Sequence, residues 1–542
     1  MSWRLRAEQL LGRATDFLEG RPGPFVVLAV ALVVWWVQAL VIPLAPGRDF
    51  GTYAGAWVEL FQRHPVDLGY VLGRTPLAPI VVGALLDPLD GRLAEAGVSL
   101  LYAGSVLAWF LAARRFGGGA ALATMVVLLL YPSYGILFHQ LASDAVFAAA
   151  FAAWSYLTVC VVLRPSTLRF ALVGLGIGLL VLVRPGNQAL VVLALVPLLL
   201  VLPWRARIAG SLALLASAVA VLGIWTVHNG ARFGDYTVAR GGNSRLPFER
   251  VYLTDRIVRP GNGPASRRLA DAAERELLTV EPYRSYGIRL DDLFDDPSPR
   301  MKDDLGWLAN ELDGWSSDER LLRQVGIEAV RTHPGVYARG VAKTVLKQLH
   351  GPVFRPLSSS TDTSASAQAV TSPAEDDVGA DTVVVDGRRL PRPSEGERIP
   401  APHQGGPTSP DGSIYTVWTS PTEHHLVFVH PGDRARLEAL HRRIGELEGS
   451  FPDRVGSDTL ALRFNQLSRW FPPPLLWIVV ALAALAIRRP GHVVALATPA
   501  LAAFIVVVLN ALAIAGVPRP PDEAVRLPAP ARHRVHGSCA RR

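Results

Sequence analysis

The sequence has little charge, little cysteine and almost no lysine for its length. Only 18% of its 542 residues are charged, whereas 50% are hydrophobic. An ordinary soluble enzyme carries about a quarter charged residues, so the composition excludes that class. The two cysteines, Cys160 and Cys539, form neither a disulfide framework nor a metal site. Three lysines accompany 51 arginines, a skew typical of a GC-rich bacterial genome.

The sequence also lacks a nucleotide-binding loop and a basic face for nucleic acid. The glycines at 117–119 are not followed by the Lys-Ser/Thr pair that a phosphate-binding loop requires. The formal net charge of +8 divides into +5 for residues 1–227, −3 for 228–470 and +6 for 471–542. The basic excess therefore flanks apolar segments, and we expect no nucleic-acid partner.

Long apolar runs dominate both ends of the chain. Residues 228–470 between them are polar, and the runs are close to the length that crosses a bilayer. This pattern predicts a mainly α, polytopic transmembrane helical bundle with a large extracytoplasmic insertion. The runs lie near residues 24–44, 93–113, 119–137, 144–163, 169–183, 186–203, 206–226, 473–487 and 491–516.

Basic residues indicate which connectors face the cytoplasm. Four arginines precede residue 22, and further arginines lie at 114–115, 164, 169, 205, 207 and 488–489. By the positive-inside rule these segments are cytoplasmic, and residues 45–92, 138–143 and 228–470 face outside. The alternation closes only if residues 76–90 form a short helix against the outer leaflet. We therefore expect a multi-pass protein of the cell membrane with residues 228–470 extracytoplasmic.

The composition divides the chain into six segments. Helical periodicity in the polar part predicts helices at 318–331, 334–349 and 431–448, and a stretch rich in Ser, Thr, Pro, Gly and Asp predicts a disordered linker. The segments are a transmembrane module (1–227), an extracytoplasmic region (228–356), the linker (357–412), a second extracytoplasmic region (413–470), C-terminal transmembrane helices (471–516) and a tail (517–542).

The loop after the first apolar run is the most informative segment. It contains Arg48-Asp49 with Tyr53 four residues on, at the expected membrane–water boundary. A carboxylate at that boundary could take a proton from a hydroxyl. The alternative is that Asp49 only caps the helix expected at 50–63.

A second acid and an arginine are expected on the same side of the membrane. Asp144 lies at the outer end of an apolar run, shortly after His139, and it too could be a helix N-cap. Arg184 lies between two apolar runs and breaks the positive-inside pattern. A phosphate matches its guanidinium group well, although the side chain could instead snorkel to lipid headgroups.

These motifs resemble the GT-C superfamily of polyprenyl-phosphate-sugar glycosyltransferases, in particular its protein-mannosyltransferase and aminoarabinose-transferase-like branch. The resemblance covers residues 24–234. It is carried by Arg48-Asp49 with Tyr53, Arg74-Thr75-Pro76-Leu77, Tyr131-Pro132, Leu141-Ala142-Ser143-Asp144, and Gly178 with Leu182-Val183-Arg184-Pro185. The chain departs from the pattern in having Phe50 where many relatives have Glu, and a single Pro76.

The resemblance implies an inverting glycosyltransferase whose catalytic module is residues 1–227. The donor would be a sugar on a polyprenyl phosphate, and the acceptor a hydroxyl of an envelope glycan, lipid or protein. Asp49 would be the base and Asp144 a second catalytic acid, with Arg48, Tyr53, Arg74, His139 and Arg184 binding substrate. No cofactor is certain. A divalent cation, Mg²⁺ or Mn²⁺, is left open, and the sequence offers no metal-ligand motif.

Two other classes of protein remain open on the sequence. A flippase or transporter of lipid-linked saccharides would carry substrate-binding charges inside its spans and preferably a repeat between two halves. A non-enzymatic envelope scaffold would depend on residues 228–470 and not on Asp49 or Asp144. In every case the partners include membrane lipids.

Overall fold

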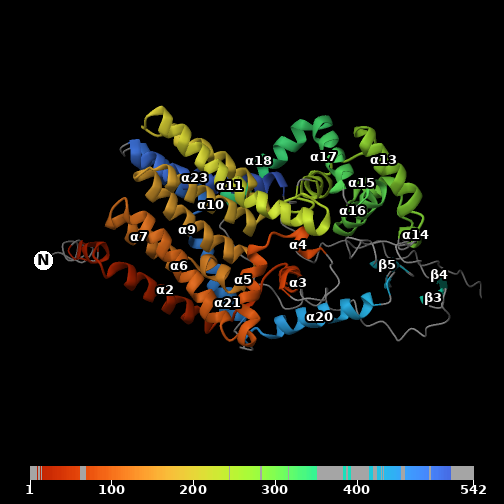
Figure 1. Cartoon of the computed structure of the whole chain (residues 1–542), viewed down its shortest axis with the longest axis horizontal. Coiled ribbons are helices and arrows are strands. Elements are labelled where there is room, and N and C mark those ends of the chain that lie inside the picture. The colour runs from red at the N-terminus through yellow and green to blue at the C-terminus, as the bar shows by residue number, and fades with distance from the viewer. Residues whose placement is uncertain are drawn as a thin grey trace, which may run out of the picture. The chain divides into compact units, whose positions relative to one another are not determined.

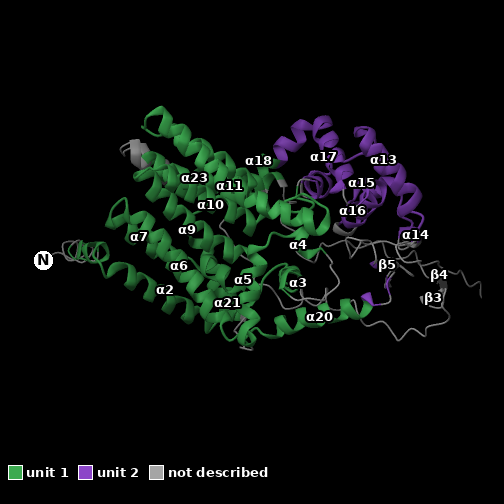
Figure 2. Cartoon of the chain, in the orientation of Figure 1, with its two compact units in different colours: residues 1–242, 341–371, 434–512 green, residues 243–340, 372–433, 513–542 purple. Residues whose placement is uncertain are grey.

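The structure, a computed structural model, describes most of the chain and divides it into two compact units (Figure 2). The first unit comprises residues 1–242, 341–371 and 434–512, and the second comprises 243–340, 372–433 and 513–542. The described residues are 9, 12–13, 15–61, 69–242, 244–280, 283–314, 317–350, 382–385, 388–391, 414–418, 424–428, 430, 432–452, 458–486 and 490–513. The fold is mainly α, as the sequence predicted.

Long apolar helices make up the first unit (Figure 1). Each predicted apolar run corresponds to a helix, and α6 contacts α2, α7 and α9, while α10 contacts α9 and α11. The helices are α2 (Gly23–Ala39), α6 (Ala94–Arg114), α7 (Gly118–Leu130), α8 (Pro132–Phe138), α9 (Ser143–Leu163), α10 (Thr167–Val183), η2 (Pro185–Leu199), α11 (Trp204–Phe233), α22 (Pro474–Ala486) and α23 (Pro490–Ala513).

Three of the described helices are long and apolar enough to cross a membrane. They are α6, α9 and α11, and α7 with α8 forms a fourth candidate that bends by 67°. The bend falls where Tyr131 precedes Pro132, and a residue before proline is disfavoured in the helical conformation. These helices define a membrane protein, and shorter apolar helical stretches lie at Gly23–Ala39, Leu77–Leu86, Thr167–Val183, Pro185–Leu199 and Val493–Leu509.

Two glycines let α10 and α11 approach closely. A Cβ atom on Gly174 would lie 2.0 Å from the Leu214 carbonyl oxygen, and one on Gly178 would lie 2.7 Å from the Val221 Cβ. The two positions are four residues apart and therefore share one helix face. Small residues at such spacing are how helices in lipid pack without a hydrophobic driving force.

Short elements connect the long helices of the first unit. The segment expected to be a half-helix is α5 (Leu77–Leu86), whose ten residues extend about 15 Å and cannot cross a core of about 30 Å. The side of the membrane on which it lies stays a prediction. The other elements of the first unit are α3 (Phe50–Phe61), α4 (Tyr70–Gly73), η1 (Pro88–Gly91), α20 (Asp433–Gly449), α21 (Asp458–Gln466), η8 (Leu467–Trp470) and the strands β1 (Ala45–Pro46) and β2 (Gln140–Leu141).

The second unit is a group of short helices around its own apolar core. Phe248, Tyr252, Leu293, Leu305 and Val325 are among the buried residues of that core. The helical elements are α12 (Arg245–Glu249), η3 (Arg250–Thr254), η4 (Pro260–Asn262), α13 (Pro264–Ala272), η5 (Ala273–Leu277), α14 (Tyr283–Tyr286), α15 (Leu290–Asp295), α16 (Pro299–Asp313) and α17 (Arg320–Thr332); α18 (Pro334–His350) continues into the first unit.

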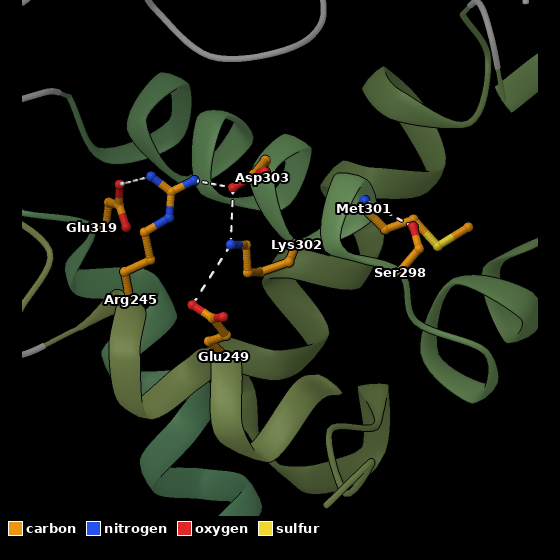
Figure 3. A network of polar contacts seen from close by, with 7 residues as sticks. All are labelled: Arg245, Glu249, Ser298, Met301, Lys302, Asp303 and Glu319. Atoms are coloured by element: carbon orange, nitrogen blue, oxygen red, sulfur yellow. Dashed lines mark hydrogen bonds and ion pairs between the residues drawn. The ribbon is translucent and has the colours of Figure 1, made fainter. Parts of the chain in front are cut away.

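Ion pairs join the helices of the second unit. Arg245 lies between Asp303 at 2.5 Å and Glu319 at 4.0 Å, and Lys302 contacts Asp303 at 3.1 Å and Glu249 at 3.6 Å (Figure 3). These five charged side chains tie α12 to α16 and to the residue before α17. Because every cation in the network already has acidic partners, we interpret it as structural.

The predicted helices of the polar region are present with shifted ends. The helix expected at 318–331 is α17, which begins at Arg320 because Asp318 and Glu319 have positive φ angles. Two antiparallel strand pairs were not predicted: β3 (Thr382–Val385) with β4 (Arg388–Pro391), and β5 (Ile414–Trp418) with β6 (His424–Phe428). Apart from β3 and β4, the expected linker 357–412 lies outside the described residues, as does the tail 517–542.

Candidate functional site

A short parallel strand pair brings the two candidate acids together. Ala45 of β1 pairs with Gln140 of β2, and Pro46 pairs with Leu141. Asp49 and Asp144 each follow three residues after this last pair, at the beginning of α3 and α9 respectively. The register therefore places the two aspartates the same number of residues beyond the strand pair, although they are 95 positions apart in sequence.

Gly47 allows the two segments to approach so closely. A Cβ atom there would lie 2.6 Å from the Ala142 Cβ, and its N–H donates to the Leu141 carbonyl at 3.1 Å. A larger residue would push the two backbones apart. Gly47 therefore permits the close approach of the two segments that carry Asp49 and Asp144.

Asp49 pairs with Arg74 and does not cap α3 through its side chain. It has a left-handed backbone with φ of 63°, and its carbonyl accepts hydrogen bonds from the Thr52 hydroxyl and amide. Its carboxylate lies 3.3 Å from the Arg74 guanidinium. Among the described residues no backbone N–H donates to that carboxylate, so the side-chain cap proposed as an alternative is absent.

Asp144 forms an ion pair with Arg184. The N-cap of α9 is Ala142, which has no side-chain cap bond, so the alternative that Asp144 is the N-cap is wrong. Asp144 lies in the first turn, where the helix dipole favours a negative charge. Arg184 follows the end of α10, and its guanidinium donates to the Asp144 carboxylate. Both side chains remain partly exposed, at 30% for Asp144 and 39% for Arg184.

Tyr53 connects the two acid–arginine pairs. Its hydroxyl donates to the Ser143 hydroxyl at 2.8 Å, and the Arg74 guanidinium carbon lies 5.5 Å from the centre of its ring. Tyr53 and Ser143 are both buried, with 6% and 5% exposed. We call the set of Asp49, Arg74, Tyr53, Ser143, Asp144 and Arg184 the paired-acid site. Ser143 was not among the predicted site residues.

Contacts between α3 and α4 place Arg74. The Val71 amide donates to Glu59 Oε2 at 2.9 Å, and the Arg240 amide donates to the Leu72 carbonyl at 2.8 Å. Burial and the Glu59 carboxylate raise the pKa of Tyr70 to about 12. Tyr70 is therefore a neutral packing residue at physiological pH, and Arg74, the residue after α4, is held beside α3.

The last two predicted site residues differ in their surroundings. Arg48 is exposed beside Asp49 and makes no ion pair or hydrogen bond with any residue that the structure describes. His139 is fully buried, and its ring stacks on Trp35 with a centre distance of 4.7 Å. Its carbonyl accepts from the Ala45 amide at 2.9 Å. In this structure Arg48 is available to an anion, whereas the His139 side chain packs against α2.

A helix from much later in the sequence packs beside α3 and α5. The Arg443 guanidinium of α20 pairs with the Asp87 carboxylate, which also accepts from the Trp57 indole N–H at 2.8 Å. The Phe451 and Phe50 rings meet edge-to-face at 5.2 Å. The sequence did not predict these contacts. Arg443 and Asp87 are 356 positions apart, so no local sequence pattern indicates that they pair. Phe50 follows Asp49 directly, so α20 packs next to the paired-acid site.

The donor groups around the site do not fit a divalent cation. The described residues contain no group of three or more His, Cys, Asp or Glu side chains that could hold a metal ion. Each of Asp49 and Asp144 has an arginine as its neighbour, whose positive charge opposes a cation.

Comparisons with known proteins assign neither a family nor a function. No protein-family model matches the chain, and no curated protein sequence matches it. Among solved structures, the crystal structure of ArnT from Cupriavidus metallidurans bound to undecaprenyl phosphate is similar with a TM-score of 0.32. Sequence identity is 16%, over 91% of this chain and 78% of that chain. A TM-score this low is not evidence of a common fold.

Proposed function

We propose that the protein is a bacterial membrane glycosyltransferase that moves a sugar from a polyprenyl-phosphate donor to a hydroxyl of an envelope acceptor. The observation that carries this proposal is the paired-acid site, in which Tyr53 and Ser143 join the pairs Asp49–Arg74 and Asp144–Arg184. The motif resemblance of residues 24–234 to the GT-C superfamily supports it. The site offers both a proton acceptor and cationic groups for a phosphate.

In the proposed reaction the Asp49 carboxylate is the general base. It accepts the proton of the acceptor hydroxyl as that oxygen attacks the anomeric carbon of the sugar. The bond from the anomeric carbon to the phosphate oxygen breaks, and polyprenyl phosphate leaves with the electron pair. Attack opposite the leaving group inverts the anomeric configuration. Asp49 suits this role because its side chain is 44% exposed and does not cap a helix.

The arginines would neutralise the leaving phosphate. Arg184 is the first candidate because its guanidinium is partly exposed, and guanidinium groups bind phosphate through two parallel hydrogen bonds. Asp144 holds Arg184 in place in the structure, and on donor binding it would share or exchange this contact with the phosphate. Arg48 would be a second phosphate ligand, since it lies beside the base with no partner among the described residues. Stabilising charge that develops on a leaving group is a major part of catalysis.

Transfer from defined donors tests the proposal. Membranes containing the protein would be given a panel of radiolabelled polyprenyl-phosphate sugars, and labelled acceptor would be extracted and counted. We expect transfer from at least one donor, a mannosyl donor being the first to test, and loss of transfer in the Asp49→Asn variant. Translocation of intact donor without cleavage would identify a transporter. An unchanged cellular phenotype in Asp49→Asn and Asp144→Asn would indicate a scaffold.

The proposal places the paired-acid site and residues 228–470 outside the cytoplasm of a multi-pass cell-membrane protein. Its support is the positive-inside distribution of arginines together with the short length of α5. A cysteine introduced at position 300 or 400 should react with an impermeant reagent in intact cells. Protection of both positions until the cells are lysed would contradict this orientation.

A further inference from the structure

The segment before the last apolar helices exposes a stripe of large apolar and basic side chains. α21 and η8 form a continuous helical segment from Asp458 to Trp470. Four of its exposed residues recur at spacings of three, four and three, which places them on one face, beside the exposed Thr459, Leu462, Gln466 and Arg469. We call them the α21 outer stripe: Leu460, Arg463, Leu467 and Trp470.

The opposite face of the same segment is fixed to the helical bundle. Ala461 is buried in a small apolar cluster with Ile42 and Ile136, against which Phe464 packs. The Ser133 hydroxyl donates to the Ser468 hydroxyl at 2.7 Å, and both serines are buried. These contacts hold the segment in one orientation. The α21 outer stripe therefore faces away from the helical bundle.

The exposure of this stripe is unusual for a surface that meets water. Trp470 is 87% exposed and Leu467 is 51% exposed, although large apolar side chains gain most from leaving water. Trp and Arg side chains are favoured where one end of a group is apolar and the other is polar, as in the interfacial layer of a bilayer. The stripe contains this combination.

We infer that the α21 outer stripe lies in the interfacial layer of the lipid bilayer and anchors the end of the polar insertion there. Continuity with the apolar helices identifies the occupant as lipid, because Trp470 is four residues before Pro474, where α22 begins. Leu467 and Trp470 would enter the boundary of the acyl chains, and Arg463 would contact phospholipid phosphates. Because the buried face contacts α8 and Ile42, which follows α2, the anchor would fix the loops beside them relative to the membrane surface.

Depth measurement by spin labelling tests this inference. Both native cysteines would be replaced by alanine, and single cysteines would be introduced as Leu467→Cys or Trp470→Cys in the full chain. The matched control is Ala435→Cys, an exposed position on α20 that the inference does not place in lipid. In nanodiscs of phosphatidylcholine and phosphatidylglycerol, collision rates with oxygen and with a water-soluble nickel chelate would be compared at each label.

We expect the labels at 467 and 470 to favour oxygen over the nickel chelate by at least threefold relative to the label at 435. Equal ratios at all three positions would overturn the inference by placing the stripe in water. A label shielded from both reagents would overturn it as well, because it would indicate a protein partner or a second copy. Because two positions of the stripe are labelled separately, the test still gives a result if one variant fails to fold.

Discussion

The Tyr53 hydroxyl donates to the Ser143 hydroxyl at 2.8 Å, and both side chains are buried. This bond links the first turn of α3 to the first residue of α9, and it therefore links two acid–arginine pairs. The two-residue pairing of β1 with β2 also joins the segments that precede Asp49 and Asp144. The bond restricts how the two carboxylates can move relative to each other.

We predict that Tyr53→Phe and Ser143→Ala each destabilise the protein. Each change leaves one buried hydroxyl without its partner, which costs about 1–3 kcal/mol. Tyr53→Phe keeps the ring beside Arg74, so the loss is confined to the hydroxyl. Thermal unfolding in detergent measures the effect on the melting temperature.

A double-mutant cycle separates this bond from other effects. The variant with both changes should be at least as stable as either single variant, because it leaves neither hydroxyl buried without its partner. Ser143→Thr, which keeps the hydroxyl, should remain closer to wild type than Ser143→Ala. Full additivity of the two single changes would show that the hydroxyls are not coupled.

Arg184→Gln should weaken donor binding. In the proposed reaction its guanidinium donates charge-assisted hydrogen bonds to the lipid phosphate. Loss of such a contact costs about 1.5–3 kcal/mol, which lowers the affinity for the donor by roughly ten- to a hundredfold. Binding of undecaprenyl phosphate to purified protein, measured by thermal shift or calorimetry, provides the value. Arg169→Gln, at the other end of α10, is the matched control and should bind normally. Asp144→Asn should not weaken binding of the phosphate, and a clear loss there would contradict the exchange between Asp144 and phosphate.

Arg443→Gln should loosen α20 from the loop that carries the paired-acid site. Arg443 is the partner of the Asp87 carboxylate, and both side chains are partly exposed, so the expected loss is about 0.5–1 kcal/mol. The expected result is faster proteolysis within 433–452 in folded protein. Arg442→Gln, at the exposed neighbouring position, should leave the cleavage rate unchanged. Equal cleavage rates in the Arg443→Gln and Arg442→Gln variants would show that only apolar contacts hold α20 in place.

Glu328→Gln should reduce the acid sensitivity of the second unit. The Glu328 carboxylate of α17 accepts from the Ala265 and Ser266 amides, at 2.9 and 2.8 Å, and so caps α13. The pKa of Glu328 lies below its usual 4.5: burial opposes this shift, but these amides and the Ser266 hydroxyl outweigh it. A lowered folded-state pKa means that the stabilisation is present above about pH 4.5 and is lost as pH falls through the folded value. The variant should be less stable at pH 7 by about 1 kcal/mol, and the difference should shrink by pH 3 in chemical unfolding.

The sequence predicted the helices well and the site only in part. Apolar length and proline positions are local properties, so the helices of the first unit and the shortness of α5 could be read directly from them. The pairing of Asp49 with Arg74 and of Asp144 with Arg184 could not be read from the sequence. It depends on β1 and β2, which are two residues each and too short to show an alternation of apolar and polar residues. The burial of His139 is likewise decided by packing against Trp35.

The unpredicted strands show a different limit. β5 and β6 are short runs that contain β-branched or aromatic residues, and five residues that include Pro421 separate them, which is a strand signal in the sequence. The polar composition of the surrounding region hid this signal. Local patterns thus account for the elements, while the contacts that build the paired-acid site are tertiary.

Asp49→Asn should abolish sugar transfer in a protein that still folds and still binds its lipid donor. Asparagine tolerates the left-handed backbone that Asp49 adopts, so the change is mild for the fold. An amide cannot accept the acceptor proton, and a positioned general base contributes about 10²–10⁴-fold in rate. Asp90→Asn is the matched control, since Asp90 is another exposed aspartate with positive φ in the same loop. Transfer should fall at least a hundredfold in the first variant and stay near wild type in the second, with undecaprenyl-phosphate binding retained in both. Near-normal turnover in Asp49→Asn would remove the base assignment, and attention would then move to Asp144, whose carboxylate is the other proton acceptor in the paired-acid site.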